Sequence, residues 1–215
     1  MSLSNAVSSG RQTSGATKPP AAESPGRGRR SARRKEIRTE LATIFMREGF
    51  RDLTIDSLAK RLGCSNRTLY TIAPSKEEMF LAVVSDKLER ATREGLEGAQ
   101  IHEDPVARIE AYIRPGVIHS RDLGIKALQD IQSYLPAKAL LDRYREERMR
   151  GLEEIVASGI ESGSFRAVHP HLVAEFLLAG IHRFQQLSLE QKSELPFDQA
   201  VEELYDLLLH GVLHT

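Results

Sequence analysis

The stretch LAKRLGCSNRTLYTIAPSKEEMF, residues 58–80, holds parts of three helices in close succession and decides the fold. The first helix has apolar residues at helical spacing and ends at Gly63, which supplies a permissive C-terminal cap. Ser65 can cap a second, very short helix. Ser75, with Glu78 three residues later, forms a capping box that opens a third and much longer helix. Two short helices joined by a tight glycine-containing turn are typical of the helix-turn-helix, whose second helix enters the major groove of DNA.

Helical periodicity extends on both sides of this stretch. Upstream, one apolar stripe of a helix is formed by Ile37, Leu41, Ile44 and Phe45. The helical pattern begins at about residue 29 and continues to the C-terminus, without the alternation typical of a strand. Pro115 and Gly116 are expected to break one of the later helices, because proline cannot donate the backbone hydrogen bond of a helix interior. The sequence therefore predicts an all-α fold.

Charge is distributed unevenly along a chain whose formal net charge is zero. Residues 27–76 carry 13 Lys or Arg against 5 Asp or Glu, whereas residues 77–215 carry 15 against 24. A basic segment beside an acidic body suggests a polyanion-binding face on one side only, although a merely solvated basic segment would show the same pattern. Residues 1–28 contain almost no large apolar side chain, so we expect a disordered basic tail there.

The compartment follows from the absence of certain segments in the sequence. No apolar run approaches the length of a membrane span, and the N-terminus has no apolar stretch typical of a signal peptide. The single cysteine, Cys64, cannot form an internal disulfide or build a thiolate zinc site by itself. We therefore expect a cytoplasmic protein with no membrane partner.

The first turn of the very short helix carries side chains that can recognise bases. Asn66 and Arg67 can each offer two hydrogen bonds to a base edge, and Thr68 offers a hydroxyl and a methyl group. Tyr70 and Lys76 are suited to contacts with phosphates. This short helix is therefore the candidate for sequence recognition.

Residues 33–80 resemble the DNA-binding domain of the TetR family of bacterial transcriptional regulators. The resemblance rests on LTIDSLAKRLGCSNRTLY, residues 53–70, and SKEEMF, residues 75–80, in the order and spacing of that family. It implies a three-helix DNA-binding domain over residues 29–76 and a larger helical domain for ligand binding and dimerisation over residues 77–215. The predicted DNA-contacting residues are Thr54, Ser65, Asn66, Arg67, Thr68, Tyr70, Thr71 and Lys76.

The larger domain offers two further predictions from its own residues. Apolar and polar side chains on the middle helices have the mixture expected of a cavity for a small apolar or amphipathic ligand, and the predicted lining is Ile113, Val117, His119, Leu128, Ile131, Tyr134, Tyr144 and His182. The last two helices have wide apolar faces, which are either monomer core or the interface of a homodimer. We favour the dimer interface, formed by Phe176, Gly180, Phe184, Val201, Leu204, Tyr205 and Leu208.

Other classes of protein find little support in the sequence. No pairing of a nucleophile with a base and no glycine-rich phosphate loop is apparent, so we predict neither an enzyme nor a bound cofactor. His169 and His171 flank a proline without a ligand partner at metal-binding spacing, so no metal site is expected. The sequence predicts a dimeric repressor that binds a palindromic DNA operator and is released by a small inducer. A transcriptional activator, or a helical interaction protein without specific DNA binding, are the alternatives.

Overall fold

The computed structural model describes the backbone of residues 25–212 and the side chains of residues 31–211, and every element in these ranges is a helix. The helices are α1 (Pro25–Glu48), α2 (Ile55–Arg61), α3 (Asn66–Tyr70), α4 (Lys76–Ile101), α5 (Pro105–Ser120), α6 (Ile125–Ser133), α7 (Leu135–Glu161), α8 (Pro170–Leu189) and α9 (Phe197–Val212). The predicted all-α fold is confirmed.

The chain divides into two compact units, residues 1–35 and residues 36–215, and every contact discussed below lies within the second unit. The helix α1 begins at Pro25, inside the segment for which the sequence predicts a disordered tail. The rest of that predicted tail, residues 1–24, lies outside the described residues.

Side-chain caps fix the starts of the three helices that follow α1. Thr54 and Ser57 form a reciprocal capping box at the start of α2, with both side-chain to backbone distances at 3.1 Å. The hydroxyl of Ser65 accepts from the amide of Thr68 at the start of α3. Ser75 caps α4 by accepting from the amide of Glu78. These caps satisfy amide groups that helix starts leave unpaired. The local sequence therefore determines where α2, α3 and α4 begin.

The first of two apolar cores lies under the helix-turn-helix. Phe45, Leu58, Leu69 and Phe80 come from four different helices and are fully buried in it. The rings of Phe45 and Phe80 meet edge to face with centroids 5.7 Å apart, and Phe50 stacks on Phe80 at 4.5 Å. This core fixes α2 and α3 against the end of α1 and the start of α4.

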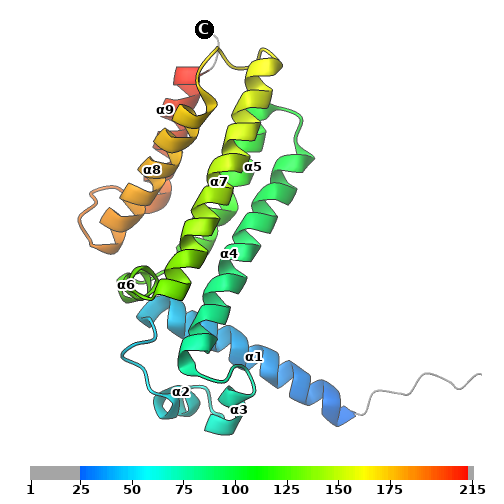
Figure 1. The fold of residues 1–215 in the computed structure, drawn as a ribbon, viewed down its shortest axis with the longest axis vertical. Coiled ribbons are helices and arrows are strands. Elements are labelled where there is room, and N and C mark those ends of the chain that lie inside the picture. The colour runs from blue at the N-terminus through cyan, green and yellow to red at the C-terminus, as the bar shows by residue number, and fades with distance from the viewer. Residues whose placement is uncertain (1–24, 213–215) are drawn as a thin grey trace, which may run out of the picture. The chain divides into compact units, whose positions relative to one another are not determined.

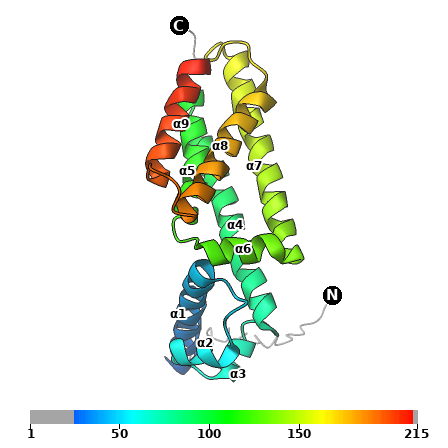
Figure 2. The ribbon, with the colours of Figure 1, turned by 90° about the vertical axis from the view of Figure 1, so that its left-hand side faces the viewer.

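The second core lies among the helices that follow. Figure 1 shows α4, α5 and α7 running side by side, with α8 and α9 packed at the edge of this group. Figure 2 shows that α6 runs across the direction of these long helices, beside the end of α1. The amide of Gly124, just before α6, donates to the carbonyl of Met46 in α1 at 2.7 Å. The short helix α6 therefore contacts the helix-turn-helix region directly.

The prediction that Pro115 breaks a helix was wrong, because α5 runs through it to Ser120. A proline at this position removes one backbone hydrogen bond, the one that the carbonyl of Ala111 would accept. The carbonyl of the next residue, Tyr112, accepts a hydrogen bond from the guanidinium of Arg148 in α7. Tight packing against α4 and α7 holds α5 in place, so tertiary contacts override the local preference.

Candidate DNA interface and ligand cavity

The helix α3 presents an open polar surface above its buried anchor, Leu69. The side chain of Arg67 is exposed and makes no hydrogen bond or ion pair with any other residue in the described ranges. Tyr70 is 51% exposed. Both side chains are therefore available to a partner without losing a contact inside the chain.

Most of the other residues predicted to contact DNA also hold the helix-turn-helix together. The amide of Asn66 donates to the carboxylate of Asp56 in α2 at 2.5 Å. The hydroxyls of Ser65 and Thr68 lie 3.0 Å apart, and Thr71 donates to the carbonyl of Thr68 at 2.7 Å. One N–H of the Asn66 amide is therefore used inside the chain, while its second N–H and its carbonyl oxygen remain for a base.

Lys76 is partly engaged inside the chain. Its ammonium donates to the carbonyl of Leu53 at 2.6 Å and to the carbonyl of Arg51 at 3.3 Å. It also lies 5.5 Å from the centroid of the Phe50 ring. An ammonium has three N–H donors, so one remains for a phosphate. Lys76 supports the loop before α2 whether or not it contacts DNA.

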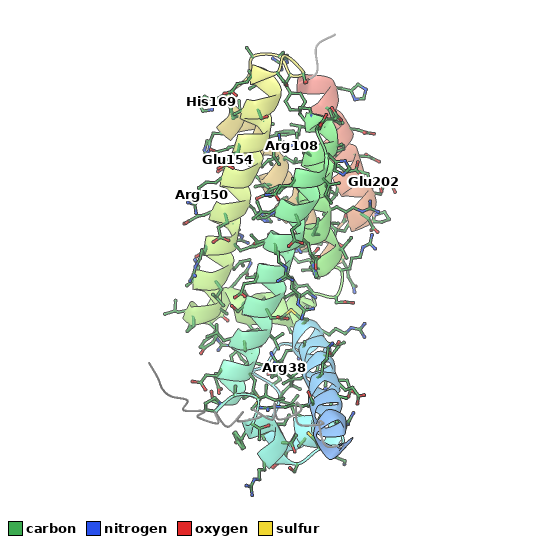
Figure 3. The ribbon with its side chains drawn as sticks, turned by 90° about the vertical axis from the view of Figure 1, so that its right-hand side faces the viewer. Arg38, Arg108, Arg150, Glu154, His169 and Glu202 are labelled. Atoms are coloured by element: carbon green, nitrogen blue, oxygen red, sulfur yellow. The ribbon has the colours of Figure 1, made fainter. Side chains whose placement is uncertain are left out.

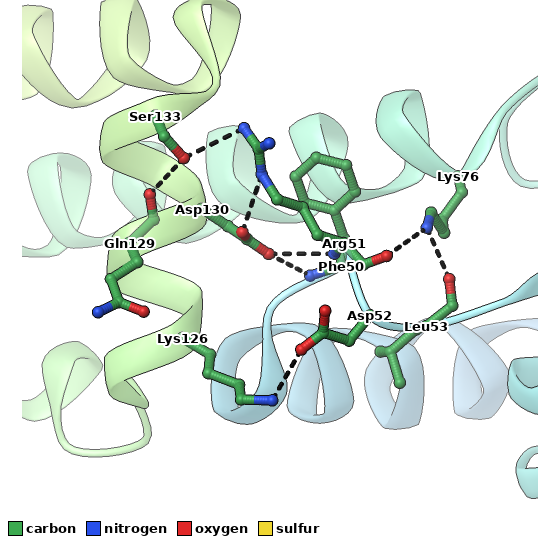
Figure 4. Close-up of polar contacts among 9 residues, drawn as sticks. All are labelled: Phe50, Arg51, Asp52, Leu53, Lys76, Lys126, Gln129, Asp130 and Ser133. Atoms are coloured by element: carbon green, nitrogen blue, oxygen red, sulfur yellow. Dashed lines mark hydrogen bonds and ion pairs between the residues drawn. The ribbon is translucent and has the colours of Figure 1, made fainter.

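The same loop is held from the other side by a buried carboxylate that the sequence did not single out. Asp130 of α6 accepts hydrogen bonds from the amides of Phe50 at 2.7 Å and of Arg51 at 3.1 Å. The Nε atom of Arg51 lies 3.1 Å from the other carboxylate oxygen. Figure 4 shows these bonds together with the ion pair between Lys126 and Asp52 at 2.7 Å. We name Phe50, Arg51, Asp130 and Lys76 the loop anchor.

Gly49 makes the loop anchor possible. Its φ angle of 73° lies in the left-handed region, and a Cβ atom at this position would lie 2.3 Å from the carboxylate of Asp130. The glycine thus both turns the chain at the end of α1 and leaves room for the carboxylate.

A cavity of about 120 Å³ lies among α1, α4, α5, α6, α7, α8 and the start of α9. Seven of the eight side chains predicted to line a ligand cavity line this one: Ile113, Val117, His119, Leu128, Ile131, Tyr144 and His182. The eighth, Tyr134, lies elsewhere, because its ring packs against Phe50 with centroids 5.4 Å apart. Sequence analysis missed Lys87, Arg145 and Arg148, which also line the cavity.

The histidines of the cavity have different surroundings. His119 lies with its Nε2 atom 2.7 Å from the carboxylate of Glu94. Burial, together with the positive charges of Arg145 and Arg148, lowers the pKa of His182 to about 4. His182 is therefore neutral at neutral pH and can act as a hydrogen-bonding group of the cavity wall.

This pKa predicts a pH dependence of stability. The unfolded chain takes up a proton at His182 near pH 6.5 but the folded chain does so only near pH 4, so the free energy of unfolding falls as pH falls through this window. The loss is at most about 3 kcal/mol. Denaturant unfolding of the wild type and of His182→Gln measures it, with His102→Gln as the control, because His102 is exposed. An unchanged pH dependence in His182→Gln would contradict the prediction.

The residues predicted for a dimer interface divide into two groups. Val201 and Leu208 are buried in the second core, so they belong to the interior of the chain and not to its surface. A Cβ atom on Gly180 would lie 3.0 Å from Leu204 of the same chain, so this glycine serves the packing of α8 on α9. The hydroxyl of Tyr205 donates to the carbonyl of Val106.

The remaining predicted residues, Phe176 and Phe184, differ in exposure. Phe176 is 55% exposed, and Phe184 is partly buried. Two exposed side chains that the sequence analysis missed accompany Phe176 on α8 and α9: Leu172 is 68% exposed and Leu207 is 66% exposed. Apolar residues of the two helices thus extend beyond what the core of one chain covers.

Within residues 31–211, no three His, Cys, Asp or Glu side chains are grouped so that they could hold a metal ion. No helix in the described part of the chain combines the length and the apolarity needed to cross a membrane.

A capped helix-turn-helix, with only helices among the described residues and a cavity farther along, is typical of the class of DNA-binding regulators. The model of the bacterial regulatory proteins of the tetR family matches residues 39–83. The regulator RutR of Escherichia coli strain K12 is 23% identical over 200 residues, which cover 85% of this chain and 91% of RutR. Residues 39–83 therefore form a DNA-binding domain of the tetR family, and the chain is a DNA-binding transcriptional regulator.

Solved structures share the fold. The crystal structure of a transcriptional regulator from Saccharomonospora viridis in complex with choline superposes with a TM-score of 0.74 at 18% identity, and covers 86% of this chain and all of that one. A TetR transcription regulator from Haloarcula marismortui superposes with a TM-score of 0.69 at 22% identity over the same shares. At these identities the likeness concerns the fold alone.

Proposed function

We propose that this regulator acts as a dimeric repressor, which binds a palindromic operator through α3 and is released when a small ligand fills the cavity. The observation that carries the proposal is the double role of α6. Leu128 and Ile131 of this helix line the cavity, while Asp130 between them is bonded to the loop that precedes α2. A ligand that displaces α6 would therefore also displace the loop anchor and, with it, the helix-turn-helix.

Thermodynamic linkage between ligand binding and DNA binding determines whether the ligand raises or lowers operator affinity. A ligand that binds better to the conformation with the weaker fit to DNA lowers operator affinity by the same factor by which DNA lowers ligand affinity. The choline of the Saccharomonospora viridis complex supports the idea that this fold can enclose a small molecule. Choline itself does not suit this chain, because its positive charge would be repelled by Lys87, Arg145 and Arg148, which line the cavity without any carboxylate.

Dimerisation through α8 and α9 is supported by the exposed apolar side chains of Leu172, Phe176 and Leu207. A dimer would bury them and place two copies of α3 on the two half-sites of an operator. An enzyme finds no comparable support among the described residues.

The double variant Phe176→Glu with Leu207→Glu is expected to convert the dimer to a monomer. Each change would place a charge without a partner in a buried interface, which costs several kcal/mol. Sedimentation equilibrium measures the mass, and Leu135→Glu is the control, because Leu135 is 77% exposed on α7. A double variant that stayed dimeric would show that another surface forms the dimer. Gly180→Glu is a poor test, since it disturbs packing within one chain.

A mobility-shift titration tests the proposed function. The wild-type chain is titrated against the DNA upstream of its own gene and against a scrambled duplex of equal length, and saturable binding to the first alone is expected. A reporter under that upstream region should then be expressed more strongly when the regulator is deleted. Weaker expression on deletion would identify an activator, and absence of preferential binding would overturn the proposal.

A further inference from the structure

The Lys and Arg side chains that line the cavity are not balanced by any acidic side chain of its wall. Lys87, Arg145 and Arg148 line it, and no Asp or Glu belongs to its wall. The rest of the lining is mainly aliphatic, including Ile113, Leu128 and Ile181. A cavity that is apolar apart from several cationic groups is suited to a ligand with an apolar body and an acidic end.

Arg148 is the most deeply buried of these cations, with 4% of its surface exposed. Its Nη1 atom donates to the carbonyl of Tyr112, and its guanidinium carbon lies 4.0 Å from the centroid of the Tyr112 ring. Among the described residues, no carboxylate lies within 4 Å of it. A buried charge without a counter-ion is costly, and an anion bound in the cavity would remove that cost.

The free side of Arg148 faces the cavity beside Tyr144. A Cβ atom on Gly116, a lining residue, would lie 2.8 Å from the hydroxyl of Tyr144 and 3.7 Å from Nη2 of Arg148. No hydrogen bond joins this hydroxyl to another described group. On the other side of the guanidinium, Gly95 leaves room for Nη1, which a Cβ atom there would approach to 2.7 Å. Gly95 and Gly116 thus leave space beside the Arg148 guanidinium and the Tyr144 hydroxyl. Both of these groups can donate hydrogen bonds to a ligand.

Arg145 is a second cationic side chain with a hydrogen-bond donor that has no acceptor among the described residues. Its Nε atom is buried and has no hydrogen-bond partner among the described residues. Its Nη1 atom lies 3.8 Å from Asp142, which also binds Lys138. The ion pair is long and shared, so Asp142 does not neutralise Arg145 fully.

The acidic groups near the cavity are engaged elsewhere. Glu94 binds His119, and Asp122 lies 3.6 Å from Arg47 as well as near Lys87. None of these carboxylates lines the cavity. The positive field inside it is therefore not cancelled by the chain.

We propose that the cavity binds a small apolar carboxylic acid in its ionised form, with the carboxylate held by Arg148, Tyr144 and Arg145. This inference rests on the proposed function, in which the cavity holds the inducer. The cavity of about 120 Å³ is smaller than the roughly 150 Å³ that encloses a benzene molecule, so the ligand must be small, and benzoate marks the upper limit of its size. Leu128 and Ile131 of α6 would contact its apolar body.

Three probes of nearly equal shape test the charge requirement: benzoate, benzamide and benzamidinium, which are anionic, neutral and cationic. Isothermal titration calorimetry on the full chain is expected to show benzoate binding more tightly than benzamide by about tenfold or more, the difference that a charge-assisted hydrogen bond makes. Benzamidinium should bind the weakest of the three. Equal affinities for benzoate and benzamide, or no binding of benzoate up to its solubility limit, would overturn the inference.

Variants locate the binding group. Arg148→Met should remove the preference for benzoate over benzamide while benzamide still binds, and Tyr144→Phe should reduce it severalfold. The matched control is Arg150→Met, because Arg150 is on the same helix but on the outer side of α7, as Figure 3 shows. Circular dichroism checks folding. If Arg148→Met fails to fold, Tyr144→Phe and Arg145→Gln carry the test, and a preference unchanged in both would overturn the inference.

The outcomes separate the ligand class from the proposed function. Preferential binding of benzoate that depends on Tyr144 and Arg148 supports the inference, whatever happens to DNA binding. Loss of operator binding on addition of benzoate supports both proposals. If the chain binds its operator but shows no preference for the anion, the ligand class is overturned and the DNA-binding function stands.

Discussion

Asp130→Ala is expected to lower the free energy of unfolding by about 2 to 4 kcal/mol, because a buried donor left without its acceptor costs about 1 to 3 kcal/mol. The carboxylate is 10% exposed and accepts from two backbone amides, so its removal leaves both amides and Arg51 without their partner. Denaturant unfolding, followed by circular dichroism, measures the change. Asp130→Asn should recover only part of it, because an amide can accept at one atom and has no charge for Arg51.

The control for this prediction lies in the same contact region. Asp52 makes an ion pair with Lys126 of α6, but both side chains are largely exposed. Asp52→Asn should therefore change stability little. If Asp130→Ala were no more destabilised than Asp52→Asn, the loop anchor would not be the main link between α6 and the helix-turn-helix.

The helix-turn-helix could be predicted closely because its determinants are local. Caps at Thr54, Ser65 and Ser75 and the glycine at position 63 act within a few residues, so their pattern is visible in the sequence alone. The contact between α6 and the loop could not be predicted in this way. Asp130 is an acidic residue in a polar stretch, and its partners are about 80 positions away.

The sequence also could not predict the whole of the cavity wall or the exposed surface of α8 and α9. Apolar spacing identified most side chains of the cavity wall, yet it gave no sign of Arg148, because an arginine in a charged helix usually faces water. Spacing also could not separate Val201 and Leu208, which the core covers, from Leu207, which it leaves exposed. Which part of an apolar face is covered depends on how neighbouring helices pack, and that is a property of the whole fold.

The second large effect is expected at the DNA interface. Arg67→Ala should weaken binding to the operator by about 1 to 3 kcal/mol for each half-site that loses a bidentate contact with a base. The structure favours Arg67 over Asn66 for this role, because Arg67 has no partner among the described residues whereas the amide of Asn66 is bonded to Asp56. Asn66→Ala is therefore expected to act partly through the packing of α2 on α3.

Base reading and simple charge attraction differ in their dependence on sequence and salt. Loss of a base contact should reduce affinity for the operator much more than for a scrambled duplex, whereas loss of a phosphate contact weakens both and flattens the slope of log affinity against log salt. Fluorescence anisotropy over a salt series, with the Arg150→Ala variant as the charge-matched control, separates the two. An equal loss for both duplexes in Arg67→Ala would assign Arg67 to the phosphates, and sequence recognition would then have to come from other residues of α3.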